Sequence, residues 1–515
     1  MHLVARDCQR LIAGTYLRPG WLLVCFLLFV SWIPSASGQL NLKLREGQLG
    51  AGTTWETRWH VIETGVPGPT VLVVGGIHGN EPAGFRAADQ IRHWPVERGK
   101  LIVIPKVNRL GVEANTRWAP DHRNDREARD LNRNFGSLEQ PEPRTDHCRA
   151  LWKFVEEERP EWIFDLHEGF DFHRVNPKSV GSSVIAFPDQ SDFAAKLQRA
   201  VNQNIPEALH FDLLDRSGPV VGSLARAGRE KIGANSFILE TTFKNQSVSK
   251  RSRQHRIMVS TALVELGMLR GIQADCLMPS TGLSRIRVGV FDDAGASEAK
   301  VMRVLDSSQG LLATVLGPED VKAEVLSQLD VLIFPGGSGS AQGKAIGAKG
   351  REVIRNYVES GGGVIGICAG AYLCSSHYQW SLNLMNAKVF NEMVEVPEVG
   401  PKSMWYRGKA TDVEVEVSAQ GNPILGISGI HSIRYQNGPI LSPGNRPDLP
   451  EYSTLAYFRT ENGIYEAQKN TMVNAPAVVV SQFGKGRVLA ISPHFESTKG
   501  QGKVILDAIK YVGRR

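Results

Sequence analysis

Short apolar runs that end at glycine-rich or polar loops recur in the first half of the chain. They stand at residues 71–84 (VLVVGGIHGNEPAG), 162–169 (WIFDLHEG) and 236–243 (SFILETTF). Apolar runs of this length are typical of strands buried within a sheet. We therefore expect an α/β sheet here, with polar side chains at the carboxyl edges of its strands, where such sheets place their sites.

The pattern breaks near residues 276–285 (CLMPSTGLSR), where a helix-like stretch gives way to proline, serine, threonine and glycine. It restarts at 286–295, 330–340 and 363–373 as apolar runs that alternate with amphipathic helices. This alternation predicts a second domain built on a parallel sheet with helical crossovers. Between Tyr378 and Tyr465 the residues alternate in polarity and are rich in aromatics and prolines, which predicts a β-rich insertion.

The N-terminus has the pattern of a secretory signal. Three arginines precede the apolar run 21–33 (WLLVCFLLFVSWI), and small residues follow at 34–38. The run is shorter than the roughly 20 residues of a spanning helix, so we predict a signal peptide at 1–38 that is cleaved before Gln39. An uncleaved membrane anchor is the alternative, because the segment before the apolar run is long for a signal. Either way, we expect an extracytoplasmic protein, periplasmic or secreted.

Length and charge agree with a multidomain globular protein. The 515 residues permit two to four domains at about 150 residues each. The net charge of +6 is spread without long basic runs, so nucleic-acid binding gets no support. The predicted boundaries are a first domain at 39–275, a linker at 276–285 and a second domain at 286–515.

Cysteine usage indicates neither a disulfide scaffold nor a structural zinc site. Beyond the predicted signal, the cysteines are few and scattered: Cys148, Cys276, Cys368 and Cys374. Neither their number nor their spacing fits such a framework.

The loop that follows the first apolar run presents His78 and Glu81 together, and His167 ends the second run. Two imidazoles and one carboxylate are a common ligand set for catalytic Zn²⁺, with a fourth position left open. The three residues therefore predict a metal site at the edge of the first sheet.

Other residues supply what a metal-assisted hydrolase needs. Glu240 ends the third apolar run and is a candidate general base. Arg117 is a candidate to stabilise an oxyanion, although Arg109 and Arg123 lie near enough in sequence to compete. Asn132 and Arg133 are candidates to bind a substrate carboxylate, which a guanidinium holds through two hydrogen bonds.

With the run DLNRNFG (130–136), these residues resemble the zinc carboxypeptidase superfamily, in particular its succinylglutamate desuccinylase/aspartoacylase-like branch, over residues 50–270. The resemblance implies a mixed sheet flanked by helices. It also implies a role for each matched residue, with His78, Glu81 and His167 as ligands of one Zn²⁺, Glu240 as general acid/base, Arg117 at the oxyanion, and Asn132 and Arg133 as carboxylate clamp. Digestive-type members use a mobile tyrosine, whereas this chain has none between Tyr16 and Tyr357; His173 or His210 are the candidate replacements.

In the second domain, Cys368 lies between an apolar run and a helix-like segment rich in small residues. A strand that turns sharply into a helix places a nucleophile at the bend, where the helix N-terminus stabilises a thiolate. His494 is a candidate base, with Glu496 to orient it. The backbone amides of Gly336 and Gly337 are candidates for an oxyanion hole.

This domain resembles the class I glutamine amidotransferase-like superfamily, most closely the N-terminal domain of biotin-protein ligases, over residues 285–512. The resemblance implies a flavodoxin-like fold and a triad of Cys368, His494 and Glu496, with Gly336 and Gly337 near the oxyanion. A small buried cysteine is the alternative interpretation of Cys368.

Together these patterns predict an exported zinc-dependent hydrolase of an amide next to a free carboxylate, either a metallocarboxypeptidase or an N-acyl amino acid deacylase. A peptide or an N-acyl amino acid is the expected substrate. The alternatives are a Cys368-dependent amidase or peptidase and a binding scaffold with a silent zinc site. No ATP site is expected, because Lys344 in GGSGSAQGK is not followed by the Ser or Thr of a P-loop.

Overall fold

The computed structural model describes residues 42–279 and 284–513. The predicted signal peptide and residues 280–283 of the predicted linker lie outside the described residues. Within the described ranges, no helix combines the length and the apolar character needed to cross a membrane.

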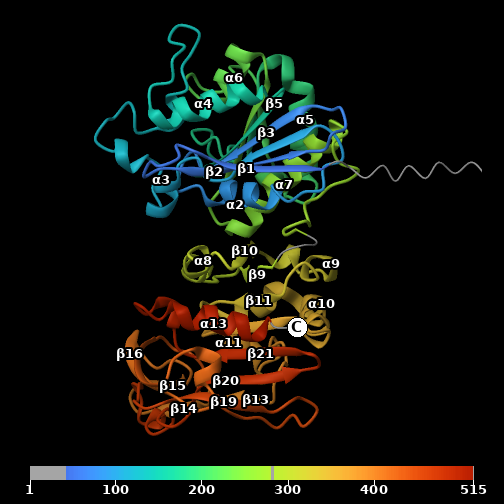
Figure 1. Ribbon diagram of the computed structural model, residues 1–515. Helices are drawn as coiled ribbons and strands as arrows, with labels where there is room; N and C mark the ends of the chain where they lie inside the picture. Colours follow the sequence, from blue (N-terminus) through green and yellow to red (C-terminus); the bar gives the residue numbers. More distant parts are fainter. Residues whose placement is uncertain (1–41, 280–283, 514–515) are drawn as a thin grey trace, which may run out of the picture. The chain divides into compact units, whose positions relative to one another are not determined.

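The first half, residues 42–279, is built on an eight-stranded mixed sheet (Figure 1). Its strands, in spatial order, are β1 (Lys43–Leu49), β2 (Thr57–Glu63), β4 (Lys100–Ile104), β3 (Thr70–Gly75), β5 (Trp162–Gly169), β8 (Asn235–Thr242), β6 (Ser183–Ile185) and β7 (Asp212–Leu214). The four central strands, β4, β3, β5 and β8, run parallel, and β1 and β2 pair antiparallel at one edge.

Helices cover both faces of this sheet. They are α2 (Pro82–Ile91), α3 (Arg109–Ala114), α4 (Asp146–Glu158), α5 (Ser191–Asn202), α6 (Leu224–Ile232) and α7 (Val248–Glu265). One core lies between the sheet and α2, α5 and α7, and a second lies between the opposite face and α4 and α6 (Figure 1). Because both faces of the central strands are buried, β3 is an almost continuous apolar run, and the polar residues of β5 are themselves buried.

The second half, residues 284–513, has a nine-stranded sheet. Its strands, in spatial order, are β10 (Leu311–Leu316), β9 (Ile286–Phe291), β11 (Val331–Phe334), β12 (Gly363–Ile367), β21 (Gly486–Ile491), β20 (Pro476–Phe483), β19 (Tyr452–Phe458), β16 (Thr411–Val417) and β17 (Gly429–Tyr435). The first five are parallel, and the last four are joined antiparallel. The expectation of an α/β fold with a mixed sheet flanked by helices, followed by a second α/β domain, is confirmed.

Helices of the second half are α8 (Glu298–Asp306), α9 (Ala323–Leu326), α10 (Gly339–Glu359), α11 (Ala369–Cys374), α12 (Asn422–Leu425) and α13 (Gly502–Val512). The segment predicted as a β-rich insertion divides in two. Part of it forms two small antiparallel sheets, β13 (Ala387–Val389) with β18 (Leu441–Pro443) and β14 (Met393–Val396) with β15 (Gly400–Ser403). Its strands β16, β17 and β19 extend the main sheet instead.

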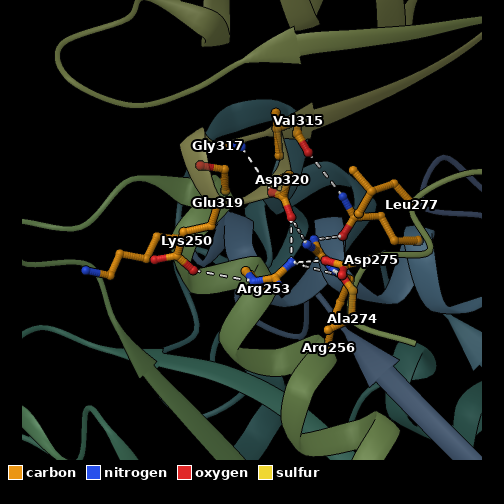
Figure 2. A network of polar contacts seen from close by, with 12 residues as sticks. Lys250, Arg253, Arg256, Ala274, Asp275, Leu277, Val315, Gly317, Glu319 and Asp320 are labelled. Carbon is orange, nitrogen blue, oxygen red and sulfur yellow. Dashed lines mark hydrogen bonds and ion pairs between the residues drawn. The ribbon is translucent and has the colours of Figure 1, made fainter. Parts of the chain in front are cut away.

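A polar network joins the two halves at α7 (Figure 2). Arg256 is fully buried and donates to Asp320 Oδ1, to the Gln90 side chain and to the carbonyl of Ala274. Arg253 donates to the same Asp320 oxygen at 2.8 Å. Asp320 follows β10 in the second half, so the two arginines tie α7 to that half through one buried carboxylate.

Candidate functional site

Three buried side chains bring their ligand atoms together where β3 and β5 end. The Nδ1 atom of His78 is 2.8 Å from one Glu81 oxygen, and the Nδ1 atom of His167 is 2.9 Å from the other. The two imidazole Nδ1 atoms are 3.1 Å apart. The three residues are 2–4% exposed, so the structure brings together all three of the predicted ligands.

Local structure explains this convergence. β3 and β5 pair in parallel, with Gly75 opposite Leu166, so the loop after β3 reaches the end of β5. Glu81 is the residue before the first turn of α2, and Pro82 starts the helix where its missing N–H costs nothing. At Gly79, an added Cβ would lie 2.0 Å from the carbonyl carbon of Gly111, so only glycine lets this loop pack against α3.

Two further carboxylates hold the imidazoles from behind. Asp130 Oδ1 is 2.9 Å from His78 Nε2, and Asp165 Oδ2 is 3.0 Å from His167 Nε2. Carboxylates in this position orient metal-binding histidines and raise their basicity. Neither role was predicted from the sequence, although Asp165 precedes His167 by two positions and therefore shares its face of the strand.

The donor set fits a zinc-type cation. Asp165 is fully buried and neither of its oxygens has a well-formed hydrogen bond among the described residues. An imidazole that binds a cation through Nδ1 carries its proton on Nε2, where His167 faces this carboxylate. Burial opposes the charged form of His167, but Asp165 and Glu81 outweigh it and raise the pKa of the imidazole. The site thus favours positive charge at its centre.

Glu240 lies on β8 directly opposite His167 of β5. It is 8% exposed, and its Oε2 atom has no hydrogen-bond partner among the described residues. Burial raises the pKa of Glu240 to about 8, with nearby Glu81 adding to the rise and His167 opposing it. A carboxyl group with a raised pKa beside a metal-type site is equipped to accept and return a proton near neutral pH.

Arg117 and Asn132, predicted to contact the oxyanion and the substrate carboxylate, both have hydrogen-bond partners within the protein. Arg117 donates to Glu81 Oε1 at 2.9 Å and lies near Asp130, whereas Arg109 contacts Glu56 and Thr54 away from the pocket. The amide nitrogen of Asn132 lies 3.1 Å from His167 Nε2. Its oxygen accepts from the backbone N–H at the start of α6, so in this structure the Asn132 amide is used inside the protein.

One pocket of about 1180 Å³ is lined by the three predicted ligands together with Glu240, Arg117 and Asn132. Its wall also includes the carboxylates Asp212 and Asp215. Lysine and arginine side chains and exposed apolar side chains line it too: Arg133, Lys178, Arg216, Arg226, Phe170, Val180, Val221 and Phe243. His173 lines the pocket, whereas His210 is not among its lining residues and instead contacts the carbonyl of Ile205. Of the two candidate replacements for the missing tyrosine, the structure brings His173 to the site.

The second predicted constellation also assembles. Cys368 has φ +51° and ψ −100°, and it joins β12 to α11. A non-glycine residue with this backbone is strained and is typical of a nucleophile at a strand-to-helix elbow. At Gly370 an added Cβ would lie 2.0 Å from the carbonyl oxygen of Phe334, so the tight turn requires glycine there.

His494 and Glu496 stand beside this cysteine. The Nδ1 atom of His494 is 2.7 Å from Glu496 Oε1. Burial opposes the charged imidazole, but its hydrogen bonds to Cys368 and Glu496 raise the pKa of His494 to about 10. Gly336 adjoins both, since a Cβ added there would lie 2.9 Å from His494 Cε1 and 3.7 Å from Cys368 Cβ. Gly337 has φ +128° and packs against Gly295.

Two family models match the chain, one in each half. Residues 67–274 match the model described as the succinylglutamate desuccinylase/aspartoacylase catalytic domain. Residues 286–507 match the one described as biotin-protein ligase, N terminal. Both resemblances expected from the sequence are confirmed, and the first supports a hydrolase of the deacylase type.

Solved structures show distant likenesses. The cell shape determinant protein Csd4 of Helicobacter pylori is 20% identical with a TM-score of 0.34, over 44% of this chain and 56% of that chain. An aspartoacylase family protein of Mesorhizobium loti is 20% identical with a TM-score of 0.34, over 44% and 68%. PurLQS from Thermotoga maritima is 15% identical with a TM-score of 0.31, over 44% and 99%. The chain thus spans little more than half of Csd4, and at these scores the likenesses say nothing of its chemistry. No curated protein matches the chain.

Proposed function

We propose that the first half is an exported zinc-dependent hydrolase of an amide bond next to a free carboxylate, of the metallocarboxypeptidase or N-acyl amino acid deacylase type. The observation that carries the proposal is the meeting of His78, Glu81 and His167 within 3.1 Å of one another, with Glu240 across from them. These three residues would hold a zinc ion, which would supply a Lewis acid able to polarise a carbonyl and activate water near neutral pH.

The chain's own residues perform the remaining steps. Glu240 accepts a proton from the attacking water and returns it to the leaving amine. Arg117, about one third exposed beside Glu81, places a positive charge where the oxyanion develops. Arg133 is the better carboxylate anchor of the predicted clamp pair, because Asn132 is already hydrogen-bonded within the protein.

The pocket favours a substrate with an anionic group and an apolar part. Its wall combines lysine and arginine side chains with an exposed apolar rim that includes Phe170 and Val221. A peptide or N-acyl amino acid with a free carboxylate has both features, and export from the cell favours the peptide.

Metal analysis tests the proposal directly. The chain purified under zinc-replete conditions is compared with the His78→Ala/His167→Ala variant, which we expect to hold one zinc fewer. Glu240→Gln should retain the metal and lose amide hydrolysis by about 10²–10⁴-fold. Equal zinc content in wild type and double variant would instead support a binding scaffold.

The elbow at Cys368 favours a second candidate activity, a cysteine-dependent amidase in the second half. The strained backbone of Cys368 and the contact between His494 and Glu496 are the observations behind it. Iodoacetamide should modify Cys368 in wild type near neutral pH, and His494→Ala should suppress that reaction. A thiol that stays unmodified in both proteins would leave the second half without a catalyst.

A further inference from the structure

A second group of metal-type side chains gathers near the start of α4, separate from the pocket. Asp121 and His122 belong to the loop between α3 and α4, and His147 belongs to the first turn of α4. Asp121 Oδ2 is 3.7 Å from His147 Nδ1 and 3.8 Å from His122 Nε2. The ligand atoms of the three residues all lie within 4.8 Å of one another.

His147 is the observation that points to a ligand. Its side chain is 1% exposed, yet neither ring nitrogen has a hydrogen-bond partner among the described residues. A buried imidazole has one N–H and one lone pair, and both are normally satisfied. The ring of Trp55 packs against His147 with centroids 4.1 Å apart, but that contact satisfies neither nitrogen. A cation beside Asp121 would take the lone pair of Nδ1.

The donor set selects the class of cation. Two imidazoles and one carboxylate suit zinc and similar divalent transition metals, whereas Ca²⁺ and Mg²⁺ prefer oxygen ligands. The distances from Asp121 Oδ2 to the two imidazoles exceed the spacing of about 3.3 Å between ligand atoms in tetrahedral zinc sites by about half an ångström. Asp121 and His122 have 28% of their side chains exposed, so both can adjust and solvent can fill a fourth position.

We propose that Asp121, His122 and His147 bind a second divalent cation of the zinc type. This cation joins the loop between α3 and α4 to the helix that follows it. The same loop carries Arg117 and Asp130, which contact the pocket's own ligand residues. The second site is therefore structural, and it holds in place the segment that supplies these two residues.

The experiment separates this site from the pocket by removing the pocket's ligands first. The full chain with His78→Ala/His167→Ala is equilibrated with Zn²⁺, freed of unbound metal and analysed for zinc by mass spectrometry. We expect one zinc per chain. Adding His147→Phe, which keeps an aromatic ring against Trp55, or His122→Ala, on a partly exposed residue, should reduce this to none. His431→Ala, on a partly exposed histidine of the second half, should change nothing.

Proteolysis gives a second readout that needs no activity. Trypsin should cleave after the exposed Arg123 and Arg126 of this loop. In the His78→Ala/His167→Ala background, Zn²⁺ should slow these cuts by about tenfold, and His122→Ala should abolish the protection. If the pocket variant folds poorly, His122→Ala in the wild-type chain should still lower the zinc content by one.

The proposal is overturned if neither His122→Ala nor His147→Phe lowers the zinc content. It is also overturned if the pocket variant holds no zinc. These outcomes are independent of the proposed function, which depends on the zinc lost through His78 and His167.

Discussion

Replacing Arg256 by methionine removes a fully buried guanidinium from the contact between the two halves. Its donors are satisfied by Asp320, the side chain of Gln90 and the carbonyl of Ala274, and Asp320 itself is 1% exposed (Figure 2). Methionine fills part of the volume but donates no hydrogen bond. The change therefore leaves a buried carboxylate with one cation fewer and the Gln90 oxygen without its Arg256 donor, while the Ala274 carbonyl keeps only a 3.5 Å contact from Arg253.

The loss in the free energy of unfolding depends on the contacts that Asp320 keeps. Breaking a buried ion pair by removing one partner costs about 3–5 kcal/mol. Asp320 keeps a second contact, since Arg253 donates to the same oxygen at 2.8 Å. We therefore expect Arg256→Met to lower the free energy of unfolding by about 3 kcal/mol, the lower end of that range. Arg253 is 14% exposed and contacts the partly exposed Asp275 as well, so Arg253→Met should cost about 1 kcal/mol.

Urea unfolding of the full chain, followed by circular dichroism and tryptophan fluorescence, measures both changes. The double variant Arg256→Met/Asp320→Asn is the decisive companion, because it removes the unpaired charge. Its loss in the free energy of unfolding should be smaller than the sum of the losses caused by the two single changes. If Arg256→Met costs no more than Arg253→Met, or if the double variant shows no coupling, the argument from the buried charge is wrong.

Three further predictions concern the carboxylates and the elbow. Asp165→Asn should weaken zinc binding by about 10–100-fold in competition with a chelator, because it removes the acceptor behind His167; unchanged affinity would contradict that role. Burial, reinforced by Glu298, raises the pKa of Asp292 from 3.8 to about 7. The neutral carboxyl therefore stabilises the folded chain fully below pH 3.8, and this stabilisation is lost as the pH rises through about 7. Asp292→Asn should therefore flatten the decline in melting temperature over that range, and an unchanged slope would refute the assignment. Cys368→Gly should relieve the positive φ and leave the melting temperature unchanged or higher, whereas a large drop would show that the side chain, not the strain, dominates.

Much of the candidate site was predictable because its residues stand at the ends of apolar runs. His78, Glu81 and His167 met as expected, since parallel neighbouring strands bring their carboxyl ends to one edge. The position of Glu240 opposite His167 follows from the same rule. The elbow at Cys368 was similarly visible, because small residues surround it in sequence.

The helix α7 shows why other features were not predictable. Its first half buries Ser249, Arg251, Ser252 and His255, so no apolar stripe marks an inner face there. Arg251 pairs with the buried Glu168 beside the site, and Ser249 donates from its backbone to Asp292 of the second half. Polar residues on a helix normally indicate solvent, and only partners distant in sequence make their burial favourable.

The sequence by itself predicted the α/β pattern of each half, the three candidate metal ligands and the residues of the candidate cysteine triad. Each of these depends on local order: apolar runs, the residue that follows them and the small residues of a turn. The tertiary structure alone decided that Asp130 and Asp165 face the Nε2 atoms of the two imidazoles and that the Asn132 amide is hydrogen-bonded within the protein. It also decided that β16, β17 and β19 extend the main sheet. It also decided that His147 is buried beside Asp121. These features depend on pairing between segments far apart in the chain, which periodicity does not encode because it records only which face of an element is apolar.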